Sequence, residues 1–334
     1  MGRKVSETSS SVGPTLLESR QSPIIPPAKP VWTHAALLVV QVAFASQAVE
    51  GKVAMLPRGQ GGEAIPPSAL AMARMLGAAL FFQAFTRIAR TLKPTTRRDQ
   101  VELALLSIVG ISLNQTLFLM GLRLTTPVSA ALLSVTIPVF TAFIAVAFRY
   151  ERPTWRLFFG LALALSGVVW LTGIRDLDRG AIIVTVNSLS YSVYLVFSRT
   201  VVQRLGALTV ITWIFTWGAV LFAPLGVVAL AQTVPHLTPR GAAFIAYILV
   251  MPTIVAYLAN AWALGRSTAS LVTIYIYLQP ILAGLLAWVQ LGQSPSARIF
   301  TAAVLILAGV TIVATRRPPA ARVRSVVEGA GETR

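Results

Sequence analysis

Residues 137–155, IPVFTAFIAVAFRYERPTW, match residues 279–297, QPILAGLLAWVQLGQSPSA, at a constant offset of 142. The same offset pairs two prolines, an arginine and a glycine with identical residues further on, without a gap: Pro138 with Pro280, Pro153 with Pro295, Arg156 with Arg298 and Gly167 with Gly309. Small apolar letters often match by chance, but a fixed offset across these four residues is much harder to obtain that way. The chain is therefore predicted to contain an internal repeat.

The composition predicts a protein that crosses a membrane many times. Of the 334 residues, 55% are apolar and 12% are charged, and the mean hydropathy is +0.73. A soluble domain typically carries about 25% charged residues, so a soluble enzyme, a disordered protein and a fibrous protein are all disfavoured. Apolar runs of membrane-spanning length predict an all-α integral membrane protein with ten transmembrane helices, at residues 34–56, 66–86, 102–121, 126–148, 156–173, 181–198, 208–231, 241–264, 269–290 and 298–315.

The basic residues predict the orientation of these spans. The net charge is +17, and twenty of the 28 lysines and arginines lie in the terminal segments and the even-numbered loops, against six in the odd-numbered loops. Cytoplasmic loops carry the excess of such residues in membrane proteins, so both the N and C termini are predicted to be cytoplasmic. This sorting explains the charge without nucleic acid, which we do not expect as a partner.

The repeat unit contains five spans. Because five is odd, the two halves must insert with opposite orientations, and inverted repeats of this kind are typical of secondary transporters that bind their substrate near the bilayer midplane. A duplicated scaffold without transport is the alternative. The predicted organisation is an N-terminal tail, two five-helix repeats and a basic C-terminal tail, at 1–31, 32–174, 175–316 and 317–334.

Several motifs occur in the order of a known family. The run GLRLTTPVSAALLSVTIPVFTAFIAVAFRYERPTW (121–155), followed by GLALALSGVVWLTG (160–173), resembles the drug/metabolite transporter superfamily, in particular its EamA-like ten-helix members. The segment NQTLFLMGLRLTT (114–126) is more particularly similar to plant nodulin-like exporters of the walls-are-thin type, which carry amino acids and auxin-like compounds. The resemblance implies an exporter of small metabolites.

The second half departs from this family pattern. The family's Leu-Gly-Glu is replaced by Leu291-Gly292-Gln293, whereas the first half keeps its acid as Glu151 in a Glu-Arg pair. If the family's Glu closes a gate through an ion pair, Glu151 is a gating residue and the second half must close in another way.

Charged side chains within the spans are costly in hydrocarbon and therefore informative. Glu50 and Arg74 lie on neighbouring antiparallel spans at similar depth, and they are predicted to pair. The pair would act as a gate or a proton-coupling element, or it would only fix helix packing. Lys52 shares a helix face with Gln41, and it either lines the cavity or extends its ammonium outward along its stem.

Amides and phenols recur at helical spacing in the spans, which predicts one polar lining. In the sixth span they form a single stripe, which is either a substrate wall or a hydrogen-bonded helix contact. The predicted substrate cavity consists of Gln41, Lys52, Arg74, Asn114, Asn187, Ser190, Tyr191, Tyr194, Tyr257, Asn260, Tyr275 and Gln279. Such a lining suits small amphipathic solutes.

Two prolines and a stripe of small residues predict where helices bend and meet. Pro138 and Pro280 each remove a helix hydrogen bond, so they are bending points for alternating access or static kinks. Small residues at helical spacing allow close helix contact, either inside the protein or between the copies of a homodimer; here they are Gly160, Ala164 and Gly167.

The predicted function is secondary transport of small metabolites such as amino acids, aromatic or auxin-like compounds or drugs, by alternating access. A nucleotide-sugar or organic-phosphate antiporter is the alternative, although it would need more basic residues in the last spans. A membrane enzyme is less favoured, because the chain has no cysteine and only two histidines, far apart in sequence. We expect no cofactor and no metal. The expected location is the plasma membrane, a bacterial inner membrane or an organelle membrane.

Overall fold

The computed structural model describes residues 30–150, 153–172, 178–264, 275–294 and 296–314, and these residues form helices and connecting turns without a strand. Within these residues, the first half contains seven α-helices and two short helical segments. In chain order they are α1 (Pro30–Met55), the short η1 (Arg58–Gln60), α2 (Pro67–Ile88), α3 (Arg97–Ser107), the π-helical η2 (Ile108–Ser112), α4 (Leu113–Leu124), α5 (Pro127–Ser134), α6 (Ile137–Ala147) and α7 (Trp155–Thr172).

The second half repeats the order of the longer helices and of the π-helical segment as far as it is described, but its short 3-10 helix follows the second helix and not the first. Its elements are α8 (Arg179–Leu205), α9 (Ala207–Thr233), the short η3 (Val234–His236), α10 (Pro239–Leu249), the π-helical η4 (Val250–Val255), α11 (Ala256–Leu264), α13 (Gln279–Leu291) and α14 (Ala297–Ala314). Local chemistry sets several helix starts. Thr126 and Thr238 each cap the helix that follows through their side-chain oxygen, and each precedes a proline in the first turn, where a missing N–H costs nothing.

Seven of the predicted spans correspond to helical segments long and apolar enough to cross a membrane: 31–55, 67–88, 97–124, 127–147, 179–205, 207–236 and 239–263. The other three correspond, in the part of the chain that is described, to shorter apolar helices at 155–171, 279–291 and 297–313. The start of the predicted span 269–290 lies outside the described residues. The chain is thus an all-helical, multi-pass membrane protein.

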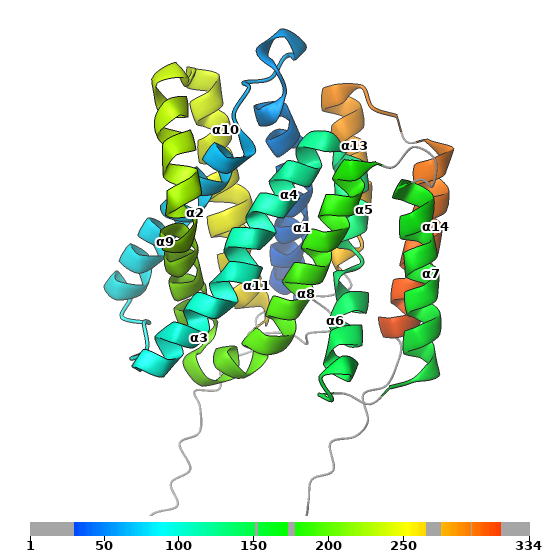
Figure 1. Ribbon diagram of the computed structural model, residues 1–334, viewed down its shortest axis with the longest axis horizontal. Helices are drawn as coiled ribbons and strands as arrows, with labels where there is room; N and C mark the ends of the chain where they lie inside the picture. Colours follow the sequence, from blue (N-terminus) through cyan, green and yellow to red (C-terminus); the bar gives the residue numbers. More distant parts are fainter. Residues whose placement is uncertain (1–29, 151–152, 173–177, 265–274, 295, 315–334) are drawn as a thin grey trace, which may run out of the picture.

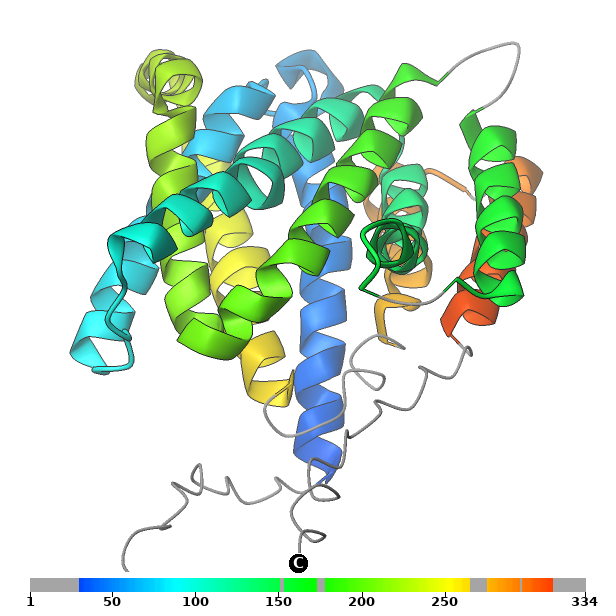
Figure 2. The same ribbon diagram turned by 60° about the horizontal axis from the view of Figure 1, so that its bottom comes forward.

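The packing follows the repeat. α2 packs against its repeat equivalent α9, and α7 packs against its equivalent α14 (Figure 1). The contact of α4 with α8 has its counterpart in the contact of α11 with α1. The start of α1 and the end of α14 lie at the same end of the bundle (Figure 2). Every main helix pair therefore joins one half to the other.

Helix breaks recur at equivalent positions in the two halves. A two-residue turn, Val135–Thr136, separates α5 from α6, and Tyr277–Leu278 forms the same turn before α13, 142 residues on. Pro138 and Pro280 stand in the first turn of the new helix in each case. The predicted bends are therefore interruptions of the helix. The π-helical segments η2 and η4 also begin 142 residues apart.

Serines on α8 provide hydrogen bonds to backbone carbonyls beside these breaks. Ser188 Oγ donates to the carbonyl of Leu133 at 3.1 Å, and Ser192 Oγ donates to that of Ile137 at 3.0 Å. The Leu133 carbonyl also accepts from Thr136, and each serine hydroxyl also lies within hydrogen-bond distance of a carbonyl of its own helix. The serines of the second half thus help to stabilise the broken helix of the first half.

The small residues of α7 form a seam inside the chain. A Cβ atom built on Gly160 would lie 2.6 Å from the carbonyl oxygen of Gly309, and one on Gly309 would lie 2.5 Å from that of Gly160. Gly167 approaches Ile306 of α14 in the same way. Of the two interpretations of this stripe, the structure supports the internal contact, because α14 occupies it.

Candidate functional site

Arg74 lies at the centre of the bundle, where elements of both halves meet. Its side chain is buried, with 3% exposure. Nη1 donates to Oε1 of Gln115 on α4 at 2.7 Å, Nε donates to Oγ1 of Thr253 at 2.5 Å, and Nη2 donates to the carbonyl of Pro252 at 3.4 Å. The guanidinium therefore connects α2 to α4 and to the π-helical segment η4.

The predicted ion pair between Glu50 and Arg74 is wrong in this structure. Glu50 Oε1 accepts a hydrogen bond from Nε2 of Gln290 at 2.9 Å, whereas Arg74 has neutral partners. The other described carboxylates are also occupied elsewhere: Glu63 by Thr238 and Arg240, Asp99 and Glu102 by Arg204, and Asp178 by Thr125. The two helices are rotated so that Glu50 faces α13 and Arg74 faces α4 and η4.

The backbone of η4 explains why Arg74 finds acceptors there. Pro252 has no N–H, so it cannot bond to the carbonyl of Ile248 one turn earlier. Thr253 Oγ1 donates to that carbonyl at 2.9 Å and accepts from Arg74 Nε. The Thr253 hydroxyl, whose hydrogen points to Ile248, and the carbonyl of Pro252 are the two oxygens that η4 presents to the buried cation.

Two predicted tyrosines lie near this arginine. The phenols of Tyr257 and Tyr191 are close enough to the Arg74 guanidinium to interact with it electrostatically. Tyr257 packs edge-on against Phe215 at 5.3 Å between ring centroids, and Tyr191 lies 5.5 Å from Tyr194. Arg74, Tyr191 and Tyr257 therefore belong to one cluster, and their role as a substrate wall remains a prediction.

The predicted stripe on α8 is divided between two roles. Asn187 Oδ1 accepts from Nδ2 of Asn114 at 2.8 Å, which joins α8 to α4. Ser190 Oγ donates to the carbonyl of Val109 in η2 at 2.9 Å. These contacts agree with the interpretation of the stripe as a hydrogen-bonded helix contact, while Tyr191 belongs to the arginine cluster.

A second polar group lies between α1 and the segment that contains α13. Gln279 Nε2 donates to Oε1 of Gln41 at 2.8 Å, and Gln41 is buried at 1% exposure. Tyr275 Oη and His34 Nδ1 lie 2.6 Å apart at the end of α1. Gln41, Gln279 and Tyr275 thus lie along α1, and their hydrogen bonds in the described part of the chain do not include Arg74.

Lys52 has a role that the sequence did not indicate. Its Nζ atom donates to the carbonyls of Leu122, Arg123 and Thr125, at 3.0, 2.8 and 2.7 Å. These carbonyls lie at the C-terminal end of α4. A helix has unsatisfied acceptors and partial negative charge at this end. The ammonium therefore caps α4. Of the remaining predicted residues, Asn260 is half-buried on α11, and Glu151 lies outside the described residues.

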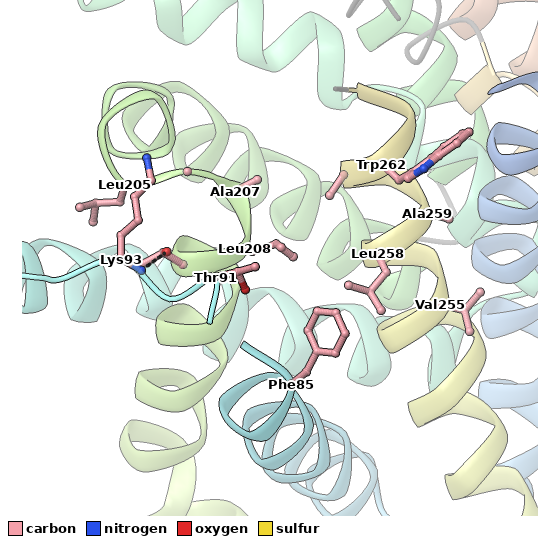
Figure 3. A pocket seen from close by; sticks show the side chains of 13 residues that line it. Phe85, Thr91, Lys93, Leu205, Ala207, Leu208, Val255, Leu258, Ala259 and Trp262 are labelled. Carbon is pink, nitrogen blue, oxygen red and sulfur yellow. Dashed lines mark hydrogen bonds between the residues drawn. The ribbon is translucent and has the colours of Figure 1, made fainter. Parts of the chain in front are cut away.

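An open cavity of about 750 Å³ lies between α2, the α8–α9 junction and α11 (Figure 3). Its lining residues lie near the C-terminal ends of α2, α8 and α11, which are at the end of the bundle where α1 begins (Figure 2). Its lining is mostly apolar, and Lys93 and Thr91 stand near the junction. Val255, which lines it, is two residues from Thr253, so the two side chains lie on different faces of the helix. Arg74 and Thr253 are not among the residues that line the cavity.

The sequence reasoning missed the η4 contribution to this site. Thr253 and Pro252 were not selected, although a proline inside an apolar span is a signal that the backbone there needs polar partners. Gln115 and Tyr257 are 142 residues apart. The repeat therefore places the amide and the phenol at equivalent positions, and both face Arg74.

The EamA-like transporter family model matches residues 32–173 and again residues 178–315. The chain belongs to the EamA-like transporter family. Relatives of this EamA-like protein are named transporters, and a solved crystal structure shares its fold at a TM-score of 0.57 with 18% identity, covering 85% of this chain and 98% of that one. The fold likeness extends over nearly the whole of the solved chain.

Three curated relatives illustrate what this EamA-like chain is similar to. The uncharacterized transporter YdfC of Bacillus subtilis is 24% identical over 75% of this chain and 82% of its own length. A probable terminal-alkyne amino-acid exporter of Streptantibioticus cattleyicolor is 27% identical over 66% and 74%. The uncharacterized inner membrane transporter YedA of Escherichia coli is 24% identical over 76% and 83%.

Proposed function

We propose that this protein is a secondary transporter that exports small amphipathic metabolites, with amino acids as the leading class, by alternating access between its two halves. The observation that carries the proposal is the Arg74 cluster. It combines a buried cation, an amide and phenols at the meeting point of both repeats, which is where carriers built from inverted repeats bind their substrates.

The broken helices support a moving mechanism. Interruptions at equivalent positions of the two halves, before Pro138 and Pro280, leave two points where helix segments change angle without breaking regular hydrogen bonds. Glu50 and Glu151 remain proposed gating or coupling residues. The proposed topology has ten crossings, with repeats at 32–174 and 175–316 between cytoplasmic tails, so that the cavity beside Lys93 opens to the cytoplasm.

The substrate class rests on the chemistry of the cluster and on one relative. An amino acid combines a charged group with an apolar side chain, which suits a single buried cation with aromatic rings around it. The name of the Streptantibioticus relative, a probable amino-acid exporter, points in the same direction. A phosphate or nucleotide-sugar carrier would need several cations, whereas Arg74 is the one buried base among the described residues.

The proposal is tested by uptake of labelled tryptophan and threonine into proteoliposomes, with and without an inward acid gradient, against protein-free liposomes. Flux of either amino acid supports the proposal, and no flux of either removes amino acids as the leading class. Stimulation by the gradient indicates proton coupling. Glu50→Gln should then lose the stimulation, and Glu102→Gln, an exposed acid bonded to Arg204, should keep it.

A further inference from the structure

Arg74 is a buried cation whose charge has no carboxylate partner among the described residues. The chain has 11 acidic residues, and the five that the structure describes are all bonded elsewhere. A charge inside a membrane protein is costly unless it is paired or serves a function. The three acceptors that surround Arg74 are a side-chain amide, a hydroxyl and a backbone carbonyl, and none of them neutralises it.

The guanidinium also keeps unused donors. It has five N–H groups, and its contacts with the described residues take one on Nε, one on Nη1 and one on Nη2. One donor therefore remains on each terminal nitrogen. Two donors on the two terminal nitrogens are the number that a carboxylate takes up in a bidentate contact.

From this count we infer that Arg74 is the recognition residue for a carboxylate carried by the transported solute. The inference rests on the proposed transport function and deepens it, because it names the group that every good substrate must share. Gln115 and Thr253 hold the guanidinium in place from two sides. Phe215 beside Tyr257 and Tyr194 beside Tyr191 offer aromatic surface to the rest of an amphipathic acid.

The first test needs no variant. Purified protein is offered three pairs of solutes that differ only in carboxylate or amide: indole-3-acetate and indole-3-acetamide, benzoate and benzamide, and L-tryptophan and L-tryptophanamide. Binding is read from ligand-induced thermal stabilisation. Hydrogen bonds to a charged partner predict that the acid binds about 10- to 100-fold more tightly than its amide in at least one pair. Equal binding in every pair, or no binding of any acid, overturns the inference.

The second test supplies the missing carboxylate from the protein. Gln115→Glu places an acid where Oε1 accepts from Arg74 Nη1, so the protein remains folded but the arginine is neutralised internally. We expect Gln115→Glu to lose the preference for acids over amides. If Arg74 only held η4 in place, the same variant would keep that preference, and this result would overturn the inference.

The matched control is the same substitution at a glutamine outside the cluster. Gln100 accepts from Trp217 Nε1 at 2.8 Å in the first turns of α3, where added negative charge is favourable. Gln100→Glu should therefore keep the wild-type preference. A separate measurement tests the proposed function. If neither acids nor amides enter proteoliposomes, the proposed transport function fails. Flux of amides with no preference for acids leaves the transporter in place and removes only the role of Arg74.

Discussion

Lys52 donates a hydrogen bond of 2.7 Å from Nζ to the carbonyl oxygen of Thr125, across the loop that ends α4. The same ammonium reaches two further carbonyls of that helix end. A cation at a helix C terminus is stabilising, and here it also provides donors for acceptors that would otherwise lack them. Through this contact α1 stabilises the C-terminal end of α4, the helix that contains Gln115.

Lys52→Met keeps an unbranched side chain, one atom shorter, and removes these donors. We expect it to lower the free energy of unfolding by about 1–2 kcal/mol, measured by denaturation in mixed micelles. Lys93→Met, at an exposed lysine, should change stability by less than about 0.5 kcal/mol. A change in substrate preference without loss of stability in Lys52→Met would instead restore the cavity-lining role predicted from the sequence.

The close contact between α7 and α14 predicts different results for a glycine-to-alanine change at two positions. Gly309→Ala places a methyl group 2.5 Å from the carbonyl oxygen of Gly160 and should destabilise the protein by about 1–3 kcal/mol. Gly284→Ala has only Val128 at 4.0 Å and should be neutral or slightly stabilising, because alanine favours the helix. Equal melting temperatures for the two variants would contradict the close contact.

Ser190 stabilises the π-helical segment η2 from the neighbouring half. Ser190→Ala removes the 2.9 Å bond to the carbonyl of Val109, and we expect a loss of about 0.5–2 kcal/mol. Ser166 bonds only to its own helix, at the carbonyl of Leu163, and is exposed there. Ser166→Ala should therefore leave unfolding unchanged, and an equal loss in both variants would show that the interhelical bond contributes nothing.

The amide pair between α1 and α13 gives a prediction about coupling. A double-mutant cycle with Gln41→Leu and Gln279→Leu should give an interaction energy of about 0.6 kcal/mol, the usual size for such bonds in membrane proteins. Unfolding of the two single variants and the double variant provides the measurement. Strict additivity would indicate that the 2.8 Å contact does not stabilise the packing of α1.

The fold could be predicted largely because its signals are local or periodic. Apolar runs show where helices lie, and the sequence offset of 142 pairs Pro138 with Pro280, which stand next to equivalent helix breaks. The π-helical segments were not foreseen. A π-helix has one extra residue in a turn compared with an α-helix. In a uniformly apolar sequence nothing marks the position of that extra residue.

The sequence indicated which polar residues lie in the spans, but it did not indicate their contacts. Arg74, Tyr191 and Tyr257 do gather, since burial of polar groups in a membrane protein favours their meeting. The partner of Arg74 was assigned wrongly, because depth in the membrane can be read from sequence while the rotation of one helix against another depends on packing. Lys52 was misread for a related reason, because the acceptors at the end of α4 are backbone atoms.

The lengths of the helices have a consequence for the surrounding lipid. α7 and α14 have 18 residues each, whereas α8 and α9 have 27, which corresponds to about 27 and 40 Å. Exposed Trp155 and Trp170 stand near the two ends of α7, where such rings anchor at the lipid headgroups. Because the hydrocarbon layer is about 30 Å thick, lipids beside α7 and α14 must thin while α8 and α9 tilt. Bilayer thickness is therefore expected to bias the conformational balance of this protein.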